Sequence, residues 1–403
     1  MTILYLCYWS INDALTVATC FPNLKILNNF TAIEKIVFIT IERNFESEVK
    51  FAPSFKNEKI EFKPLHSSDL HYGVLNKIND FVSFPKELAK LVQHYKVDKI
   101  IARGAPAGAL AYLVWKKLKT PFLVESFEPH ADYMLESGVW KNYDPRYVFQ
   151  KHWEEKQKTV AAGLMPVADN YKKKLLSEGV SEQKIRTVPV SVDTQHFSFN
   201  KPDRNEIRKK LNISSDGIVG IYVGKFGDIY YDQEAFDIFR KAFDFFGLSF
   251  RLILLTPNSI DEVKAKLLKI GIDPAKVFTA KVAHHEVPQY LSASDFAFST
   301  IKPAACRKYC SPTKNGEYWA NGLPIILTEG VGDDSDIIKN EGGGAVFNLE
   351  VPGSIESALH EIAEIISDPG CRDGILKLAE NHRSLKKAES AYQYFFAMHN
   401  TSE

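Results

Sequence analysis

The segment from Ser311 to Glu317 combines residue types that could bind an anion. Ser311 is a favourable N-cap, and Pro312 suits the first position of a helix, where a missing N–H costs nothing. The N–H groups of Thr313 and Lys314 would then point out of the helix end without intrahelical partners, beside the Lys314 ammonium group. Glu317 follows about one turn later. The pattern predicts a phosphate site, with an ordinary capped helix as the alternative.

A second positive feature follows the apolar run Gly217–Val223. Gly224 and Gly227 let the backbone approach a ligand closely, and Lys225 adds a cation there. Ligands of open α/β sheets bind beyond the carboxyl ends of the strands. Lys225 and the segment Ser311–Lys314 are therefore expected to face one cleft, and two cationic features in one place favour a diphosphate ligand.

The elements that must position these residues are strands and helices in regular alternation. In the first half, strands are expected at residues 3–8, 35–40, 99–101, 121–125 and 163–167, and helices at 84–94 and 108–118. In the second half, strands are expected at residues 217–223, 250–255, 277–279, 296–299, 324–327 and 345–347, with a helix at 206–211. Such alternation predicts an α/β protein with two doubly wound, Rossmann-like domains and parallel sheets.

The domain boundary is expected near residue 190, where a strand-like run gives way to a polar, irregular stretch at 197–204. The first domain is then 1–190 and the second is 191–385. The tail 386–403 has a helical pattern rich in aromatic residues. Its apolar face must be buried, so we expect this C-terminal helix to pack back on the first domain.

Composition excludes several classes of protein. The 403 residues carry 50 basic and 50 acidic side chains, a balance that argues against a nucleic-acid partner. The N-terminal stretch lacks a basic n-region and a cleavage site, and no apolar run is long enough to cross a bilayer. We therefore expect a cytoplasmic protein, with peripheral contact at the inner membrane face left open. The sequence indicates no oligomeric state.

Cysteine and histidine usage predicts neither disulfides nor a metal site. Five scattered cysteines suggest reduced thiols. Cys306 and Cys310 are four residues apart, but no second pair accompanies them. His284 and His285 are adjacent, so their side chains point apart, and no third ligand is evident. No cofactor is expected.

Several motifs occur together along the chain. They are Ala168–Lys172, Val192–Phe197, Tyr222–Lys225, His285–Leu291 with Ser294-Asp295, Ser311–Lys314, Glu317-Tyr318 and Gly322–Pro324. In combination they resemble the large retaining family 4 of the GT-B glycosyltransferases, also called glycosyl transferases group 1. The resemblance covers most of the chain and weakens through the first 100 residues. It implies that residues 1–190 are the acceptor-side domain and that residues 191–385 bind a nucleotide sugar.

The resemblance also implies roles for single residues. Lys225 and the amides of Thr313 and Lys314 would bind the donor diphosphate, and Glu317 would accept hydrogen bonds from the ribose. The backbone at Val282 would flank the base. The implied donor-binding residues are Gly224, Lys225, Val282, Tyr309, Ser311, Pro312, Thr313, Lys314 and Glu317. The implied catalytic residues are Lys225, Glu317 and His130, which lies where the family often has a histidine near the transferred sugar.

The chain departs from the family pattern at three places. Tyr309 stands where many members carry a second Glu aimed at the sugar, and Tyr230 stands where many carry a second basic residue. Arg307 or Lys308 could supply that charge. The glycine-rich first loop is replaced by Tyr8–Asp13. Because of these departures, the sequence does not identify the transferred sugar, and it leaves open whether the protein is catalytically active.

The resulting hypothesis is a retaining, metal-independent glycosyltransferase that uses a UDP- or GDP-sugar and a glycan, lipid-linked or small-molecule acceptor. Fixed cationic groups would stabilise the charge that grows on the departing phosphate. A nucleotide-sugar epimerase and a non-catalytic nucleotide-sugar-binding scaffold are the alternatives. Each key residue also has a plain interpretation: His130 as a surface histidine, Lys225 as a turn lysine, and Glu317 as the helical ion-pair partner of Lys314.

Overall fold

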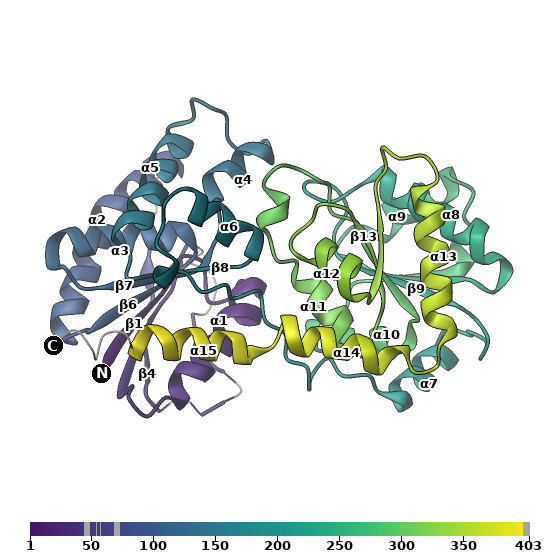
Figure 1. Ribbon diagram of the computed structural model, residues 1–403, viewed down its shortest axis with the longest axis horizontal. Coiled ribbons are helices and arrows are strands. Elements are labelled where there is room, and N and C mark those ends of the chain that lie inside the picture. The colour runs from purple at the N-terminus through teal and green to yellow at the C-terminus, as the bar shows by residue number, and fades with distance from the viewer. Residues whose placement is uncertain (44–48, 54, 57, 68–72, 398–403) are drawn as a thin grey trace. The chain divides into compact units, whose positions relative to one another are not determined.

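The computed structural model describes residues 1–43, 49–53, 55, 56, 58–67 and 73–397 (Figure 1). The chain forms two compact units. The first consists of Met1–Val190 and the segment that starts at Leu385, and the second is Ser191–Ser384. Each unit is built on a six-stranded parallel sheet, so the predicted pair of Rossmann-like α/β domains is confirmed. The roles assigned to the two domains stay predictions.

The sheet of the first unit has the strand order β4-β2-β1-β6-β7-β8, and all neighbours are parallel. Its strands are β1 (Thr2–Cys7), β2 (Lys35–Ile39), β4 (Ile60–Phe62), β6 (Lys99–Arg103), β7 (Phe122–Phe127) and β8 (Gly163–Pro166). A small separate pair consists of β3 (Ile41–Glu42) and β5 (Leu65–His66).

Helices cover both faces of this sheet. They are α1 (Ala14–Asn29), α2 (Gly73–His94), α3 (Gly104–Leu118), α4 (His130–Glu136), α5 (Pro145–Val160), α6 (Asp169–Ser177), the 3-10 turn η1 (Glu182–Lys184) and α15 (Leu385–Ala397). Helix α3 packs on β6 and β7 and is itself contacted by α2 and α5, whereas α1 and α15 pack together on the opposite face (Figure 1).

The C-terminal helix α15 belongs to the core of the first unit. Its Tyr392 and Phe395 are buried in one cluster with Ile3 of β1. The expectation that the tail 386–403 packs on the first domain is therefore confirmed, and residues 398–403 lie outside the described residues.

The sheet of the second unit has the strand order β11-β10-β9-β12-β13-β14, again with all neighbours parallel. Its strands are β9 (Val219–Val223), β10 (Arg251–Leu255), β11 (Val277–Ala280), β12 (Phe296–Ser299), β13 (Ile325–Thr328) and β14 (Gly344–Phe347). Alternate residues of β9 enter different cores: Ile221 packs with α11, and Tyr222 packs with α8.

The helices of the second unit form the two outer layers. They are α7 (Lys201–Lys210), α8 (Gln233–Phe246), α9 (Ile260–Lys269), α10 (Val287–Ala293), α11 (Thr313–Ala320), α12 (Asp334–Glu341), α13 (Ser354–Ser367) and α14 (Cys371–His382). The 3-10 turns are η2 (Gly247–Ser249), η3 (Pro274–Lys276), η4 (His284–Glu286) and η5 (Arg307–Tyr309).

Several predicted element boundaries are wrong. Helix α2 begins at Gly73 rather than at residue 84, and Pro85 lies inside it, although proline disfavours helix interiors. Part of the stretch 197–204, expected to be irregular, is helical. The Asn200 side chain accepts a hydrogen bond from the Asp203 N–H at 2.9 Å and so starts α7 at Lys201.

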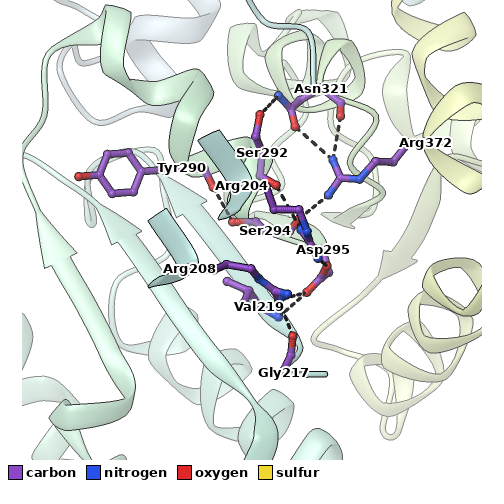
Figure 2. A network of polar contacts seen from close by, with 10 residues as sticks. All are labelled: Arg204, Arg208, Gly217, Val219, Tyr290, Ser292, Ser294, Asp295, Asn321 and Arg372. Atoms are coloured by element: carbon purple, nitrogen blue, oxygen red, sulfur yellow. Dashed lines mark hydrogen bonds and ion pairs between the residues drawn. The ribbon is translucent and has the colours of Figure 1, made fainter. Parts of the chain in front are cut away.

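A network of hydrogen bonds and ion pairs surrounds Asp295 at the amino end of β9 (Figure 2). Its carboxylate accepts hydrogen bonds from Arg204 at 2.6 Å, from Arg208 at 3.1 Å and from the Val219 N–H at 2.8 Å. Arg372 donates instead to oxygens of neighbouring residues, and burial followed by the Arg204 charge lowers its pKa to about 10. The motif that contains Asp295 therefore anchors the start of a strand.

Candidate functional site

The candidate site lies at the carboxyl edge of the second sheet, where β9 and β12 run side by side. The loops that leave these two strands pair with each other. The Tyr231 N–H donates to the Thr300 carbonyl at 2.9 Å, and the Lys302 N–H donates to the Ile229 carbonyl at 2.9 Å. The loop that carries Lys225 is thus bound to the segment that leads into α11.

Helix α11 begins one residue later than the sequence predicts. Thr313 is its first residue, and Pro312 is the N-cap, with φ −62° and ψ 120°. Ser311 is therefore not the cap, and Pro312 makes no side-chain capping hydrogen bond. The N–H groups of Thr313 and Lys314 still belong to the first turn and lack intrahelical acceptors.

The C-terminal half of α11 is firmly placed. The Tyr318 hydroxyl accepts a hydrogen bond from the Val223 N–H at 3.0 Å, which holds the helix at the end of β9. Asn321 is the C-cap, and Gly322 follows with φ +75°. A Cβ at Gly322 would lie 2.8 Å from the Arg372 carbonyl oxygen, so only glycine fits. The helix therefore ends before this glycine.

A buried polar group supports the turn before α11. Arg383 donates to the Ser311 hydroxyl and to one carboxylate oxygen of Asp334. Asn315 donates to the other Asp334 oxygen at 2.7 Å. The Arg383 carbonyl accepts from the Val192 N–H at 2.9 Å. Val192 lies next to the first residue of the second unit and Arg383 next to its last residue. The turn before α11 is therefore linked to both chain ends of the second unit.

Glu317 is a buried carboxylate, with its side chain 2% exposed and a basic partner on each oxygen. Oε2 accepts from Lys314 Nζ at 2.7 Å, and Oε1 lies 3.1 Å from His284 Nε2. Burial raises the pKa of Glu317, but hydrogen bonds and charges from His284 and Lys314 outweigh it and hold the pKa below its usual range. The predicted alternative, an ion pair with Lys314, is present.

The two lysines of the candidate site differ in their surroundings. The Lys225 ammonium pairs with Asp228 at 2.6 Å, and these side chains are 47% and 72% exposed. Such an exposed pair is weak, so an anion can replace the carboxylate. The Lys314 side chain is 34% exposed, and its ammonium keeps further N–H groups after donating to Glu317.

The remaining donor-side residues line the same edge of the sheet or the turns beside it. Gly224 follows β9 directly, and its N–H donates to the Leu255 carbonyl at 3.0 Å. Val282 is partly buried against the core next to η4. Tyr309 ends η5, and the Lys308 ammonium lies 5.2 Å from its ring centroid. The donor roles of these residues stay predictions.

His130 belongs to the first unit and is the first residue of α4. Its ring meets Trp140 edge-on, with centroids 5.7 Å apart. Burial lowers its pKa to about 4, so the imidazole is neutral near pH 7. A neutral imidazole can polarise a hydroxyl group through a hydrogen bond, or it can accept a proton.

The residue after His130 is held by a buried carboxylate that the sequence does not reveal. Glu154 of α5 accepts hydrogen bonds from the Ala131 N–H at 2.9 Å and from Gln150 at 3.0 Å. Burial raises the pKa of Glu154 to about 7, although both hydrogen bonds lower it. Glu154 therefore positions the start of α4.

Sequence reasoning missed His284, Arg383 and Glu154 as parts of this architecture. Their partners lie 33, 72 and 23 residues away, so no local spacing marks them. In the described part of the chain, no group of three or more His, Cys, Asp or Glu side chains could hold a metal ion. None of the described helices is long and apolar enough to cross a membrane.

No protein-family model and no curated protein sequence matches the chain. Solved structures do match. Sucrose-phosphate synthase from Thermosynechococcus elongatus has a TM-score of 0.75 at 12% identity, over 100% of both chains. HepE from Anabaena, in complex with UDP, has a TM-score of 0.71 at 11% identity, over 99% of this chain and 100% of its own.

A third similar structure is named as an epimerase. It is described as a UDP-N-acetylglucosamine 2-epimerase from Listeria monocytogenes, with a TM-score of 0.63 at 12% identity over 100% of this chain and 97% of its own. Likeness at such low identity establishes the fold alone. The chain therefore has the GT-B fold, as the sequence motifs predicted.

Proposed function

We propose that the protein is a glycosyltransferase that moves a sugar from a UDP- or GDP-linked donor to a glycan, lipid-linked or small-molecule acceptor. The donor binds at the carboxyl edge of the second sheet. The acceptor binds the first unit, which contains His130. Transfer proceeds with retention of anomeric configuration and needs no metal ion.

The observation that carries the proposal is the gathering of cationic groups where β9 and β12 end. Lys225 lies in the loop that leaves β9, and Lys314 and the first amides of α11 lie beyond β12; the pairing of the two loops and the hydrogen bond between Tyr318 and Val223 support a common site for them. Three positive features at one edge of a Rossmann-like sheet are typical of a diphosphate site. The UDP in the similar HepE structure supports a nucleotide as the carrier of that diphosphate.

The chemistry follows from these charges. Breaking the bond between sugar and phosphate leaves negative charge on the departing diphosphate. Lysine ammonium groups and fixed amide dipoles stabilise that charge in the transition state without reorganising. In a retaining reaction the departing phosphate can take the proton of the acceptor hydroxyl on the same face. His130, neutral near pH 7, then orients or polarises a hydroxyl.

We assign the binding of the nucleotide ribose to Glu317 together with His284 and Lys314, the side chains that contact its carboxylate. Five free cysteines suit a reducing compartment, so we infer that the protein works in the cytoplasm. Peripheral contact with the inner face of a membrane is compatible with a lipid-linked acceptor.

A thermal-shift panel with UDP, GDP, ADP and dTDP tests the proposal. A ligand at 100 times its dissociation constant adds about 2.7 kcal/mol of stability. We expect a shift with UDP or GDP, and slow hydrolysis of the matching nucleotide sugar that is lost in Lys225→Ala and Glu317→Ala. The absence of a shift with both UDP and GDP overturns the proposal. Binding without hydrolysis or transfer favours a non-catalytic scaffold.

The epimerase alternative rests on the similar Listeria structure. It predicts that the protein converts a UDP-sugar with no acceptor present and yields an altered nucleotide sugar. Proton NMR of the donor during incubation separates the two reactions. A glycosyltransferase releases UDP and a transferred or hydrolysed sugar, and the anomeric proton of the first product reports retention.

A further inference from the structure

Glu317 is poorly placed to touch a ligand directly. Its side chain is 2% exposed, and both carboxylate oxygens already accept from basic partners. The His284 side chain is 50% exposed and covers Oε1. A ligand that approaches this carboxylate therefore meets His284 on the side of Oε1 and Lys314 on the side of Oε2.

The imidazole of His284 is held in one orientation. Nε2 lies 3.1 Å from Glu317 Oε1, and the Phe197 ring meets it at 64° with centroids 5.4 Å apart. Phe197 is buried, so it forms a fixed wall behind the ring. The short turn that carries His284 is itself closed by Glu286, which accepts from the Ala283 N–H at 2.8 Å.

The pair also decides which ring nitrogen carries the proton. Glu317 remains ionised because its pKa is held below the usual range, and an ionised carboxylate can only accept. Nε2 of His284 must therefore donate. The other ring nitrogen, Nδ1, has no hydrogen-bond partner among the described residues, and it accepts from a hydroxyl when the ring is neutral or donates to one when the ring is charged.

We propose that His284 is the residue that contacts the ribose of the nucleotide, with Nδ1 hydrogen-bonded to a ribose hydroxyl and Glu317 positioning the ring. This inference rests on the proposed function, because it presumes a nucleoside diphosphate at the site. It changes the role of Glu317 from a ligand contact to a positioning residue. Lys314, on the other carboxylate oxygen, stays available to the diphosphate.

The test measures dissociation constants of UDP and inorganic pyrophosphate by calorimetry. His284→Ala should weaken UDP about three- to tenfold, the range for one lost hydrogen bond, and should leave pyrophosphate unchanged. His285→Ala removes the adjacent exposed histidine on the same turn and is the matched control. It should bind UDP as the wild type does.

Two further comparisons identify the contacting group. Removing a ribose hydroxyl, with 2′-deoxy-UDP and 3′-deoxy-UDP, should weaken binding to the wild type more than binding to His284→Ala for at least one of the two ligands. Glu317→Gln keeps an oxygen that accepts from Nε2 but turns an NH2 group toward Lys314, so its effect on UDP is compared with its effect on pyrophosphate. The loss specific to UDP should be smaller than in His284→Ala. If that specific loss is larger, the carboxylate contacts the ribose directly.

The outcomes separate this inference from the proposed function. If the wild type binds neither UDP nor GDP, the proposed function falls. If the wild type binds UDP and His284→Ala binds it equally well, this inference alone is overturned. Tighter binding by His284→Ala also overturns it, because His284 would then be a group that the ribose displaces.

Discussion

Each unit contains a buried glutamate beside a candidate catalytic or binding residue, and the pKa values of these two glutamates are shifted in opposite directions. Glu317 in the second unit is bound by Lys314 and His284, and its pKa is lowered. Glu154 in the first unit accepts from an amide N–H and from Gln150, and its pKa is raised to about 7. Burial raises the pKa of both carboxyls.

The difference shows that the partners of a buried carboxyl, rather than its burial, decide its charge. The Lys314 ammonium and the His284 imidazole offset the desolvation of the Glu317 carboxylate, whereas an amide N–H and Gln150 do not offset that of Glu154. Glu317 is therefore an anion near pH 7 and holds two basic side chains. Glu154 changes charge in the physiological range while it holds the start of α4.

The strongest test of this rule is Asp334, a carboxylate whose cationic partner is fully buried. Arg383→Met leaves the Asp334 charge without its guanidinium, with the two side chains 2% and 1% exposed in the wild type. We expect a loss of about 3–5 kcal/mol in the free energy of unfolding, measured with urea. Arg240→Met, in an exposed pair with Asp244, is the control and should cost under about 0.5 kcal/mol.

A small effect of Arg383→Met would contradict the rule. The double variant Arg383→Met with Asp334→Leu should be less destabilised than the sum of its single variants, because the second change removes the unpaired charge.

Glu154 should make stability fall as the pH rises. Its folded pKa, about 7, lies above an unfolded value of about 4.3. The folded state therefore holds a proton that the unfolded state has lost, and its contribution disappears as the pH rises through 7. Relative to Glu154→Gln, which keeps the acceptor, the wild type should lose about 2–3 kcal/mol between pH 5 and pH 8.

Urea unfolding of both proteins at pH 5, 6, 7 and 8 measures this difference. A difference that is constant with pH would show that Glu154 does not titrate in this range. If Ala131 also positions His130 for transfer, the wild-type rate should change between pH 6 and pH 8 and the Glu154→Gln rate should not.

Glu317 should show the opposite sign and a smaller effect. Its folded pKa is lowered, so its contribution is present above an unfolded pKa of about 4.3 and is lost as the pH falls through the folded value. Because Lys314 and His284 are partly exposed, Glu317→Gln should cost only about 1 kcal/mol at pH 7. The difference from the wild type should shrink as the pH falls below the unfolded pKa; a loss that does not shrink would be a packing effect.

The sheets were largely predictable from the sequence because their strands are covered on both faces. Such strands are continuous apolar runs, and the run at 296–299 matches β12 residue for residue. Helix starts were less predictable, since long-range partners decide them. Ser311 looks like an N-cap, but its hydroxyl accepts from Arg383, 72 residues away, and α11 starts at Thr313.

The candidate site was predictable only where its chemistry is local. Lys314 and Glu317 are three residues apart on one helix, so spacing alone predicts their contact. The His284 contact joins two segments 33 residues apart, and the Glu154 hydrogen bond joins α4 to α5. From the sequence, His284 and His285 could be considered only as possible metal ligands. The sequence does not show that His284 contacts the carboxylate of Glu317.

Lys225 should give the smallest effect on stability and a clear effect on binding. Its pair with Asp228 is exposed, so Lys225→Ala should change the free energy of unfolding by under about 0.5 kcal/mol. If the ammonium meets a phosphate, UDP affinity should fall about tenfold. Lys241→Ala is the matched control, because Lys241 is 42% exposed and is also paired, with Glu356. Equal UDP affinities for the two variants would remove Lys225 from the site and leave Lys314 and the α11 amides to hold the diphosphate.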